Sequence, residues 1–307
     1  KDIYAEYNQA MKEISKKMNE YFAEIGEQEQ KQRLLLKQGK ISEEDFNNWR
    51  TRKIAMGKRY EEMRDNLAAD MHNANRIAKQ TATGRMPDVY ALNHNFATYQ
   101  VEHGGKCDTG YILYNRQAVE RLRRQEEYVM PSPDKNKRHI IPKDEQWNRR
   151  KIQSIMTQGI LQGESIPQIS ARLSRDLSTA NCAATIRYAR TMTTSAQNAG
   201  REDAFKRAAE MGVKMKKRWI ATLDDRTRHT HALLHGETID IDEPFSNGLM
   251  FPADPTGDPE EVWNCRCTMR TIIDGFDHDV IESSPKMGDM SFEEWQNAHR
   301  TKEKGRR

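Results

Sequence analysis

Apolar side chains recur at steps of three and four residues near the start of the chain, and this spacing constrains the fold more than any other feature. The stripe comprises Ile3, Tyr7, Met11, Ile14, Met18, Tyr21 and Ile25. Such steps place every member on one face of an α-helix. Gly39 stands where a helix C-terminal cap often lies. We therefore expect a long amphipathic helix that ends at the polar break formed by residues 37–40.

A second stripe of the same kind follows a capping signal. Ser42-Glu43-Glu44-Asp45 is a variant of the capping box that begins many helices. The stripe after it comprises Phe46, Trp49, Met56, Tyr60, Met63, Leu67, Met71, Ala74 and Ile77. Because only a short loop separates the two helices, residues 1–80 are expected to form a long antiparallel helical hairpin.

Residues 81–146 are expected to be an irregular or linker region with one helix. The helical periodicity is lost over residues 81–114, where Gly, Asn, Pro and aromatic residues mix, so an irregular segment with short helices is expected there. His94, His103 and Cys107 lie there at a spacing that fits no familiar metal site. Residues 116–130 predict a helix of mixed charge, and the prolines and charges that follow are typical of an exposed linker.

Residues 147–274 are expected to form a separate domain of helices followed by a small α+β unit. The pattern predicts a helix from Trp147 to Gly163, a short helix capped by Ser165, and an alanine-rich helix over 179–211. Strands are predicted over 213–223, 237–241 and 263–273, with a short helix at 227–234. Residues 275–307 form a charged tail with one helix from Ser291 to about residue 301. The predicted fold class is mainly α with a small α+β C-terminal domain.

Composition narrows the possible classes of protein. The 307 residues include 50 basic and 46 acidic side chains, a net charge of +4. That excess predicts nucleic-acid binding only where basic residues cluster. The candidates are Arg121, Arg123, Arg124, Lys302, Lys304, Arg306 and Arg307, although solvated helix faces or tails produce the same pattern.

No apolar run approaches the roughly 18 residues of a membrane span, so no transmembrane helix is expected. Four cysteines do not make a secreted disulfide framework, and a reducing compartment fits better.

Possible metal ligands gather between Trp219 and Cys267. His231 and His235 are four residues apart on the short predicted helix, and Cys265 and Cys267 are two apart on a predicted strand. If the chain folds back on itself, these thiolates and imidazoles suit a tetrahedral zinc ion. Two alternatives remain open: the cysteines are small buried hydrophobic residues, or the cluster is catalytic.

The acidic and basic residues before His231 also allow two interpretations. Asp225 is placed as an N-cap of the short helix, and the neighbouring arginines could pair with Asp240, Asp242 or Glu243. The functional alternative is a metal-dependent enzyme of the nuclease or transferase type that uses Asp225, Arg228 and His231. The chain has no Walker-type, G-x-S-x-G or H-E-x-x-H sequence.

The order of these residues resembles the C-terminal domain of phage Mu F-like minor head proteins, in the head morphogenesis family of tailed phages. The family signature is Asp-x-Arg-Thr-Arg-x-x-His, then a glycine, then Asn-Cys-Arg-Cys. Here these places are occupied by Asp224, Arg226, Thr227, Arg228, His231, Gly236, Asn264, Cys265, Arg266 and Cys267. An upstream A-R-T-x-T-T-x-A-Q-N-A-G-R segment is similar too, with Met192 where members often carry Glu.

This resemblance covers roughly residues 147–273 and implies a minor head (capsid) protein of the virion that acts in head morphogenesis. It implies association with the portal protein, the inner capsid surface or packaged double-stranded DNA, with scaffold or major capsid protein as further partners. It implies assembly in the host cytoplasm. No enzymatic activity is implied for the domain itself, although it occurs fused to toxin-like modules.

Overall fold

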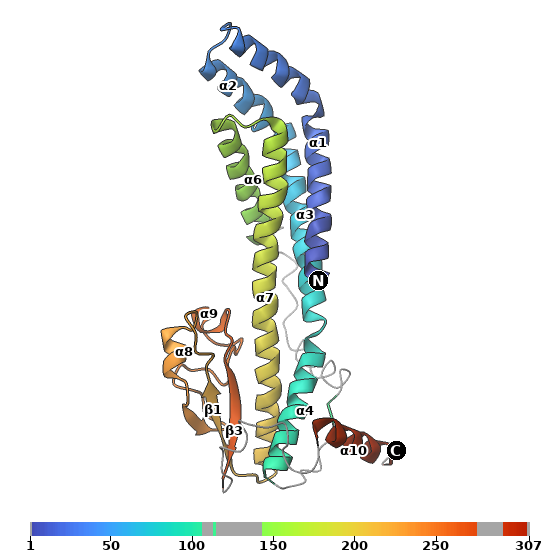
Figure 1. Ribbon diagram of the computed structural model, residues 1–307, viewed down its shortest axis with the longest axis vertical. Coiled ribbons are helices and arrows are strands. Elements are labelled where there is room, and N and C mark those ends of the chain that lie inside the picture. Colours follow the sequence, from blue (N-terminus) through green and yellow to red (C-terminus); the bar gives the residue numbers. More distant parts are fainter. Residues whose placement is uncertain (1, 106–112, 115–142, 275–290, 306–307) are drawn as a thin grey trace, which may run out of the picture. The chain divides into compact units, whose positions relative to one another are not determined.

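Long helices and one small antiparallel sheet make up the structure, a computed structural model that describes residues 2–105, 113–114, 143–274 and 291–305 (Figure 1). This confirms the mainly α fold class with a small α+β part toward the C-terminal end. The chain divides into two units. Unit 1 comprises Lys1–Ala82 and Pro133–Ile186, and unit 2 comprises Thr83–Ser132 and Arg187–Arg307.

Unit 1 is built from helices alone. They are α1 (Asp2–Lys37), α2 (Glu43–Ile54), α3 (Lys58–Thr83), α6 (Lys143–Leu161) and the first part of α7 (Ile166–Glu210). The most buried apolar side chains come from all of these helices and include Ile14, Met18, Ile54, Leu67, Met71, Ile152, Ile169 and Leu173. The long N-terminal helices expected from the apolar stripes are therefore present, and they share one core with α6 and the start of α7.

The caps expected at the first turn of the chain are confirmed. Gly39 has a φ of +69°, and Lys40 N–H donates to the Leu35 carbonyl, as in the Schellman motif that ends many helices. Ser42 and Asp45 form the reciprocal hydrogen bonds of a capping box at the start of α2.

The second N-terminal helix is not continuous, which corrects the sequence prediction. It ends at Ile54 and restarts as α3 at Lys58, with Gly57 at a φ of +88° between them. Met56 fits the spacing of the apolar stripe but is 58% exposed, because it lies in this break. A left-handed residue cannot continue an α-helix, so Gly57 separates the two helices.

A chain of buried polar side chains ties the helices of unit 1 together. The Tyr7 hydroxyl contacts Asn75 Oδ1 at 2.5 Å and Thr185 Oγ1 at 2.7 Å. Asn75 Nδ2 donates to Asn181 Oδ1 at 2.8 Å, and Asn181 Nδ2 donates to Asn148 Oδ1 at 2.9 Å. Burial raises the pKa of Tyr7 to about 12. Because each polar group needs its partner in this setting, the network fixes the relative register of α1, α3, α6 and α7.

Helix α7 corrects a second prediction. The short helix capped by Ser165 and the alanine-rich helix after residue 179 are one helix of 45 residues. Ser165 does lie at its start, where its N–H and hydroxyl contact Gln168. The segment around residue 178 contains no Gly or Pro, so nothing interrupts the backbone hydrogen bonds there.

Unit 2 combines helices with the sheet. Its elements are α4 (Met86–Gly104), the rest of α7, β1 (Met215–Ile220), α8 (His229–Leu233), β2 (Thr238–Asp240), α9 (Pro259–Val262), β3 (Thr268–Ile273) and α10 (Phe292–Gly305). The antiparallel sheet has the order β2-β1-β3, with Arg218 opposite Thr238 and Trp219 opposite Met269. The strands are shorter than predicted, and α9 lies in a segment that was expected to be loop. The helix expected from Ser291 is confirmed as α10, with a hydrogen-bonded Ser291–Glu294 pair at its start.

Helix α4 also corrects the prediction, because it lies in the segment expected to be irregular. Most of its buried side chains are small or polar, such as Ala91, His94, Ala97 and Thr98, and the larger apolar ones are Tyr99 and Val101. Small side chains suit a close approach to α7: a Cβ added at Gly200 would lie 2.5 Å from a carbonyl oxygen of α4. The helix expected at 116–130, the linker after it and Cys107 lie outside the described residues. None of the helices described is long and apolar enough to cross a membrane.

Candidate metal centre

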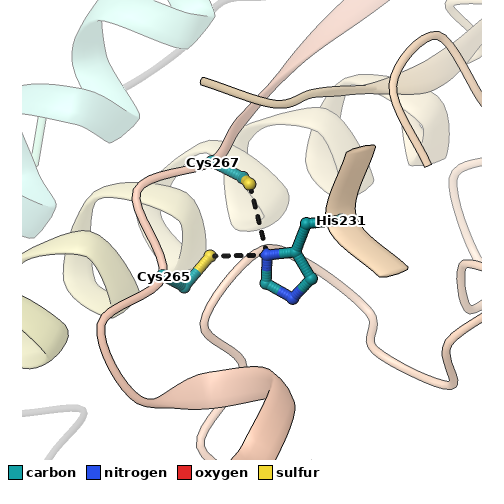
Figure 2. A group of neighbouring side chains, drawn as sticks. All are labelled: His231, Cys265 and Cys267. Atoms are coloured by element: carbon teal, nitrogen blue, oxygen red, sulfur yellow. Dashed lines mark hydrogen bonds between the residues drawn. The ribbon is translucent and has the colours of Figure 1, made fainter. Parts of the chain in front are cut away.

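Three buried side chains converge between α8 and the segment that leads into β3 (Figure 2). Nδ1 of His231 lies 3.4 Å from Cys267 Sγ and 3.8 Å from Cys265 Sγ. Exposed fractions are 2% for His231, 2% for Cys265 and 4% for Cys267. Both sulfur atoms face the same ring nitrogen, so the group presents one nitrogen and two sulfur donors to a single point.

The cysteines do not lie on a strand, which corrects the predicted strand over 263–273. Strand β3 begins only at Thr268, and both cysteines lie in the turn between α9 and β3. Asn264 opens this turn with a φ of +59°, and Cys265 N–H donates to the Val262 carbonyl at 3.3 Å. A short polar side chain tolerates this backbone region better than most. Arg266 is exposed between the two buried thiols, so the turn still directs both sulfurs inward.

Glu261 holds the other side of the His231 ring. Its Oε2 lies 2.9 Å from His231 Nε2, and the carboxylate also accepts hydrogen bonds from Thr230 Oγ1 and Asn247 Nδ2. A carboxylate on one ring nitrogen directs the other nitrogen toward its ligands. Sequence analysis did not select Glu261, because acidic residues in the first turn of a helix are ordinary.

His235 lies outside this group, contrary to the expected pair of ligands four residues apart. Helix α8 ends at Leu233, so the helical spacing does not extend to His235. The His235 side chain is exposed, and its Nδ1 accepts a hydrogen bond from Ala221 N–H at 3.2 Å. Gly236 follows with a φ of +86° and donates its N–H to the Trp219 carbonyl, which returns the chain to β2.

Hydrogen bonds, charges and burial shift the pKa values of all three side chains in this group. A hydrogen bond from Cys265 lowers the pKa of the Cys267 thiol to about 4 against the opposing effect of burial, and His231 adds to this. The same bond and burial raise the pKa of Cys265. Burial opposes the charged form of His231, but its hydrogen bond to Cys267 and the charges of Cys267 and Glu261 together raise its pKa. A thiolate is the form that binds metals, so the lowered pKa of Cys267 suits a metal ligand.

Hydrogen bonds of the Asp-Arg-Thr-Arg motif join the segment before α8 to the turn that carries the cysteines. Asp224 accepts two hydrogen bonds from the Arg266 guanidinium, each at 2.5 Å. Those bonds hold the pKa of Asp224 well below its usual range. Thr227 Oγ1 donates to the Thr222 carbonyl, and Arg228 Nη2 donates to the Trp263 carbonyl. The motif residues therefore stabilise the local backbone around the buried group.

Several expectations for charged residues are corrected here. The N-cap of α8 is Arg228 rather than Asp225, which is exposed. The ion pairs also differ from those expected: Arg266 pairs with Asp224, and Asp240 pairs with Lys216 at 3.1 Å. Among the described residues, no hydrogen bond or ion pair joins Asp225 to Arg228 or His231.

Side chains of helix α7 form hydrogen bonds with the backbone around the site. Asn198 Nδ2 donates to the carbonyls of Pro252 and Cys267, at 3.0 and 3.1 Å. Thr191 Oγ1 accepts the Asn264 N–H at 3.0 Å. Further along α7, Glu202 pairs with Lys217 Nζ of β1 at 2.9 Å, and both side chains are buried. The turn that carries the cysteines is thus anchored to a long helix.

The cavity at this site is small. It has a volume of about 10 Å³ and is lined by the three converging residues and by Thr222, Arg228 and Asn264, among others. A volume of roughly 10–15 Å³ holds one water molecule. The cavity itself is therefore about the size of one ion or one water molecule.

The basic residues predicted to contact DNA are not placed by the structure. Arg121, Arg123, Arg124, Arg306 and Arg307 lie outside the described residues. Lys302 and Lys304 lie within α10, but only their backbone is described.

A comparison with protein families matches the part of the chain that contains this site. Residues 150–270 match the family described as "Phage Mu protein F like protein". Minor head protein GP7 of Bacillus phage SPP1 is 33% identical over 127 residues, which are 40% of this chain and 41% of GP7. The NAD(+)–arginine ADP-ribosyltransferase EFV of Enterococcus faecalis is 32% identical over 142 residues, 45% of this chain and 29% of that protein.

An uncharacterized protein of Haemophilus influenzae is 30% identical over 135 residues, 44% of this chain and 27% of that protein. The chain thus spans less than half the length of each of these relatives. No solved structure matches it.

Proposed function

Because residues 150–270 match the Mu F-like family, we propose that the chain is a minor head protein of a tailed phage that acts in head morphogenesis. The observation that carries this proposal is the match to the family together with the similarity to a phage minor head protein. The family match spans the motif residues from Asp224 to Cys267. The proposed location is the virion head, after assembly in the host cytoplasm.

The geometry of the motif supports a structural role. The residues of the Asp-Arg-Thr-Arg turn bond to nearby backbone and to Arg266, and the cavity beside them is about the size of one water molecule. A nuclease or transferase centre needs catalytic groups that reach a bound substrate. The proposed role of the chain is therefore structural and not enzymatic.

The Enterococcus relative does not change this choice. Its name states an ADP-ribosyltransferase activity, but the matched region is 29% of that protein. A domain shared between a transferase and a minor head protein is more simply a common structural module than a common catalytic one. A direct check is incubation of the purified chain with NAD⁺ and arginine; release of nicotinamide would favour the enzymatic alternative.

The proposed partners are the portal protein, scaffold or major capsid protein and packaged double-stranded DNA. Portal or inner-capsid association predicts that the chain stays with particles after external protein is removed. Contact with DNA predicts that part of the attachment is sensitive to salt, since phosphate contacts release counterions.

The test is to purify virions of the encoding phage and wash them with nuclease and high salt. Mass spectrometry is then expected to find the chain at low copy, and empty heads and tails serve as the matched fractions. An in-frame deletion is expected to reduce the yield of infectious heads. A chain absent from washed heads, with normal infectivity after deletion, contradicts the proposal.

Two further measurements address the partners. Co-expression with portal protein or with major capsid protein, each alone, identifies which one retains the chain on a column. For DNA, replacing Lys302, Lys304, Arg306 and Arg307 with Gln should lower affinity and flatten its dependence on salt. Unchanged affinity would assign DNA binding elsewhere, and replacement of Arg121, Arg123 and Arg124 is the matched second variant.

A further inference from the structure

The donor atoms at the candidate metal centre are spaced as a tetrahedral ion requires. Zinc bonds of about 2.3 Å to sulfur and about 2.0–2.1 Å to nitrogen give a sulfur–nitrogen separation of about 3.6 Å at the tetrahedral angle. The two separations at His231 Nδ1 are 3.4 and 3.8 Å, and all three donor atoms lie within 4.8 Å of one another. Little movement is needed for one ion to reach all three.

We propose that His231, Cys265 and Cys267 bind one zinc ion, which fastens the turn between α9 and β3 to α8 (Figure 2). The inference does not rest on the proposed function, because a chain that is absent from virions could still bind zinc.

The chemistry of the donors selects the class of metal. Two sulfur atoms and one imidazole are soft and borderline ligands, which zinc prefers and which magnesium and calcium avoid. Copper(I) and iron also bind thiolates, so the metal itself has to be identified by experiment. Binding zinc requires two thiolates and a neutral imidazole, so it would release the protons that the group still holds.

Glu261 completes the arrangement from outside the donor set. Its carboxylate forms an ion pair with His231 Nε2 at 2.9 Å without an aligned hydrogen bond, and a small rotation of the ring would let Nε2 donate to Glu261 and turn the Nδ1 lone pair toward the sulfurs. Removal of such an outer partner weakens metal binding by about 10- to 100-fold. This gives the proposal a test that leaves all three ligands intact.

The fourth tetrahedral position faces the small cavity. Its volume of about 10 Å³ suits one water, and its remaining lining is polar, with Thr222, Arg228 and Asn264 nearby. A water molecule in this cavity would complete the tetrahedron.

The alternative use of the same atoms is a dithiol that forms a disulfide between Cys265 and Cys267. The two uses give opposite results. A zinc site protects both thiols from alkylation until the metal is removed, whereas a redox pair contains no metal and loses both thiols on oxidation.

The experiment uses the full chain, purified with reduced thiols and without chelators. Elemental analysis is expected to find one zinc per chain. Replacement by cobalt is expected to give the thiolate charge-transfer and tetrahedral visible bands of a site with sulfur ligands. Cys265→Ser, Cys267→Ser and His231→Asn should each lose the metal.

Matched controls are available within the chain. Cys182→Ser removes a free cysteine of unit 1, and His235→Asn removes an exposed histidine four residues after His231. Both should keep the wild-type metal content. Glu261→Gln should retain the cobalt spectrum while binding about 10- to 100-fold more weakly.

A measurement on the wild-type chain covers the case in which ligand variants do not fold. Chelation should speed hydrogen exchange in α8 and in residues 263–267 but not in α1 or α3. Less than half an equivalent of any metal, together with no cobalt spectrum from reduced protein, overturns the proposal. Equal metal loss in the His235→Asn or Cys182→Ser control would overturn the ligand assignment.

Discussion

The buried ion pair between β1 and α7 leads to a quantitative expectation about stability. Lys217 has no exposed surface, and Glu202 is 3% exposed. Lys217 Nζ also donates to the Met250 carbonyl at 2.9 Å, and Lys206 lies 3.3 Å from Glu202 as a second, more exposed partner. Burial raises the pKa of Glu202 and lowers that of Lys217, so each charge depends on the other.

Glu202→Leu and Lys217→Met should lower the free energy of unfolding by different amounts. Glu202→Leu leaves the Lys217 ammonium buried without a counter-charge, and breaking a buried pair in this way costs about 3–5 kcal/mol. Lys217→Met leaves Glu202 with Lys206 and able to take up a proton, so we expect about 3 kcal/mol, the lower end of that range. The double variant loses both charges and one hydrogen bond to Met250, which costs about 1 kcal/mol.

Hydrogen exchange of the β1 and β3 amides is the suitable assay, because a chain of two units need not unfold in one step. Lys216→Met is the matched control: its ion pair with Asp240 is half-exposed and should contribute at most about 0.5 kcal/mol. The reasoning fails if the double variant is less stable than Glu202→Leu alone. It also fails if Lys216→Met and Lys217→Met have equal effects.

Three further outcomes are expected. Burial raises the pKa of both Tyr7 and Tyr21 to about 12, so the stability of unit 1 should be complete below pH 10 and fall as the pH rises toward 12. The loss is about 1.4 kcal/mol per pH unit for each tyrosine, and Phe at both positions should flatten the alkaline denaturation curve. Gly200→Ala should cost about 1–3 kcal/mol because its Cβ meets a backbone oxygen, whereas Gly26→Ala in α1 should stabilise slightly; thermal denaturation compares them. Asn198→Leu should cost about 1–3 kcal/mol and increase hydrogen exchange around the cysteine turn, and unchanged exchange there would contradict its anchoring role.

Apolar periodicity and caps predicted the helices where the signal is local. The stripe through Ile14 and Met18 and the glycine cap at Gly39 appear as expected. The break at Gly57 was missed, because Met56 continues the apolar spacing even though the backbone turns there. Helix α4 was missed because close packing on α7 favours small and polar residues, and these carry no hydrophobic period.

The candidate site was predicted in part for a similar reason. Residue type and order identified His231 and both cysteines, which the structure brings together. Helical spacing wrongly included His235, because it assumed a helix one turn longer than α8. Glu261 could not be found from spacing, since its contact with His231 depends on how a long loop folds back.

The anchoring of the cysteine turn on α7 limits how this module can be cut or exchanged between proteins. Every residue of the Asp-Arg-Thr-Arg and Asn-Cys-Arg-Cys signatures lies after Val213, yet Thr191, Asn198 and Glu202 precede it. A truncation that begins at the first strand would keep the whole signature while leaving Lys217 and two loop carbonyls without their partners. Gene fusions that transfer the module intact must therefore carry the preceding helix with it.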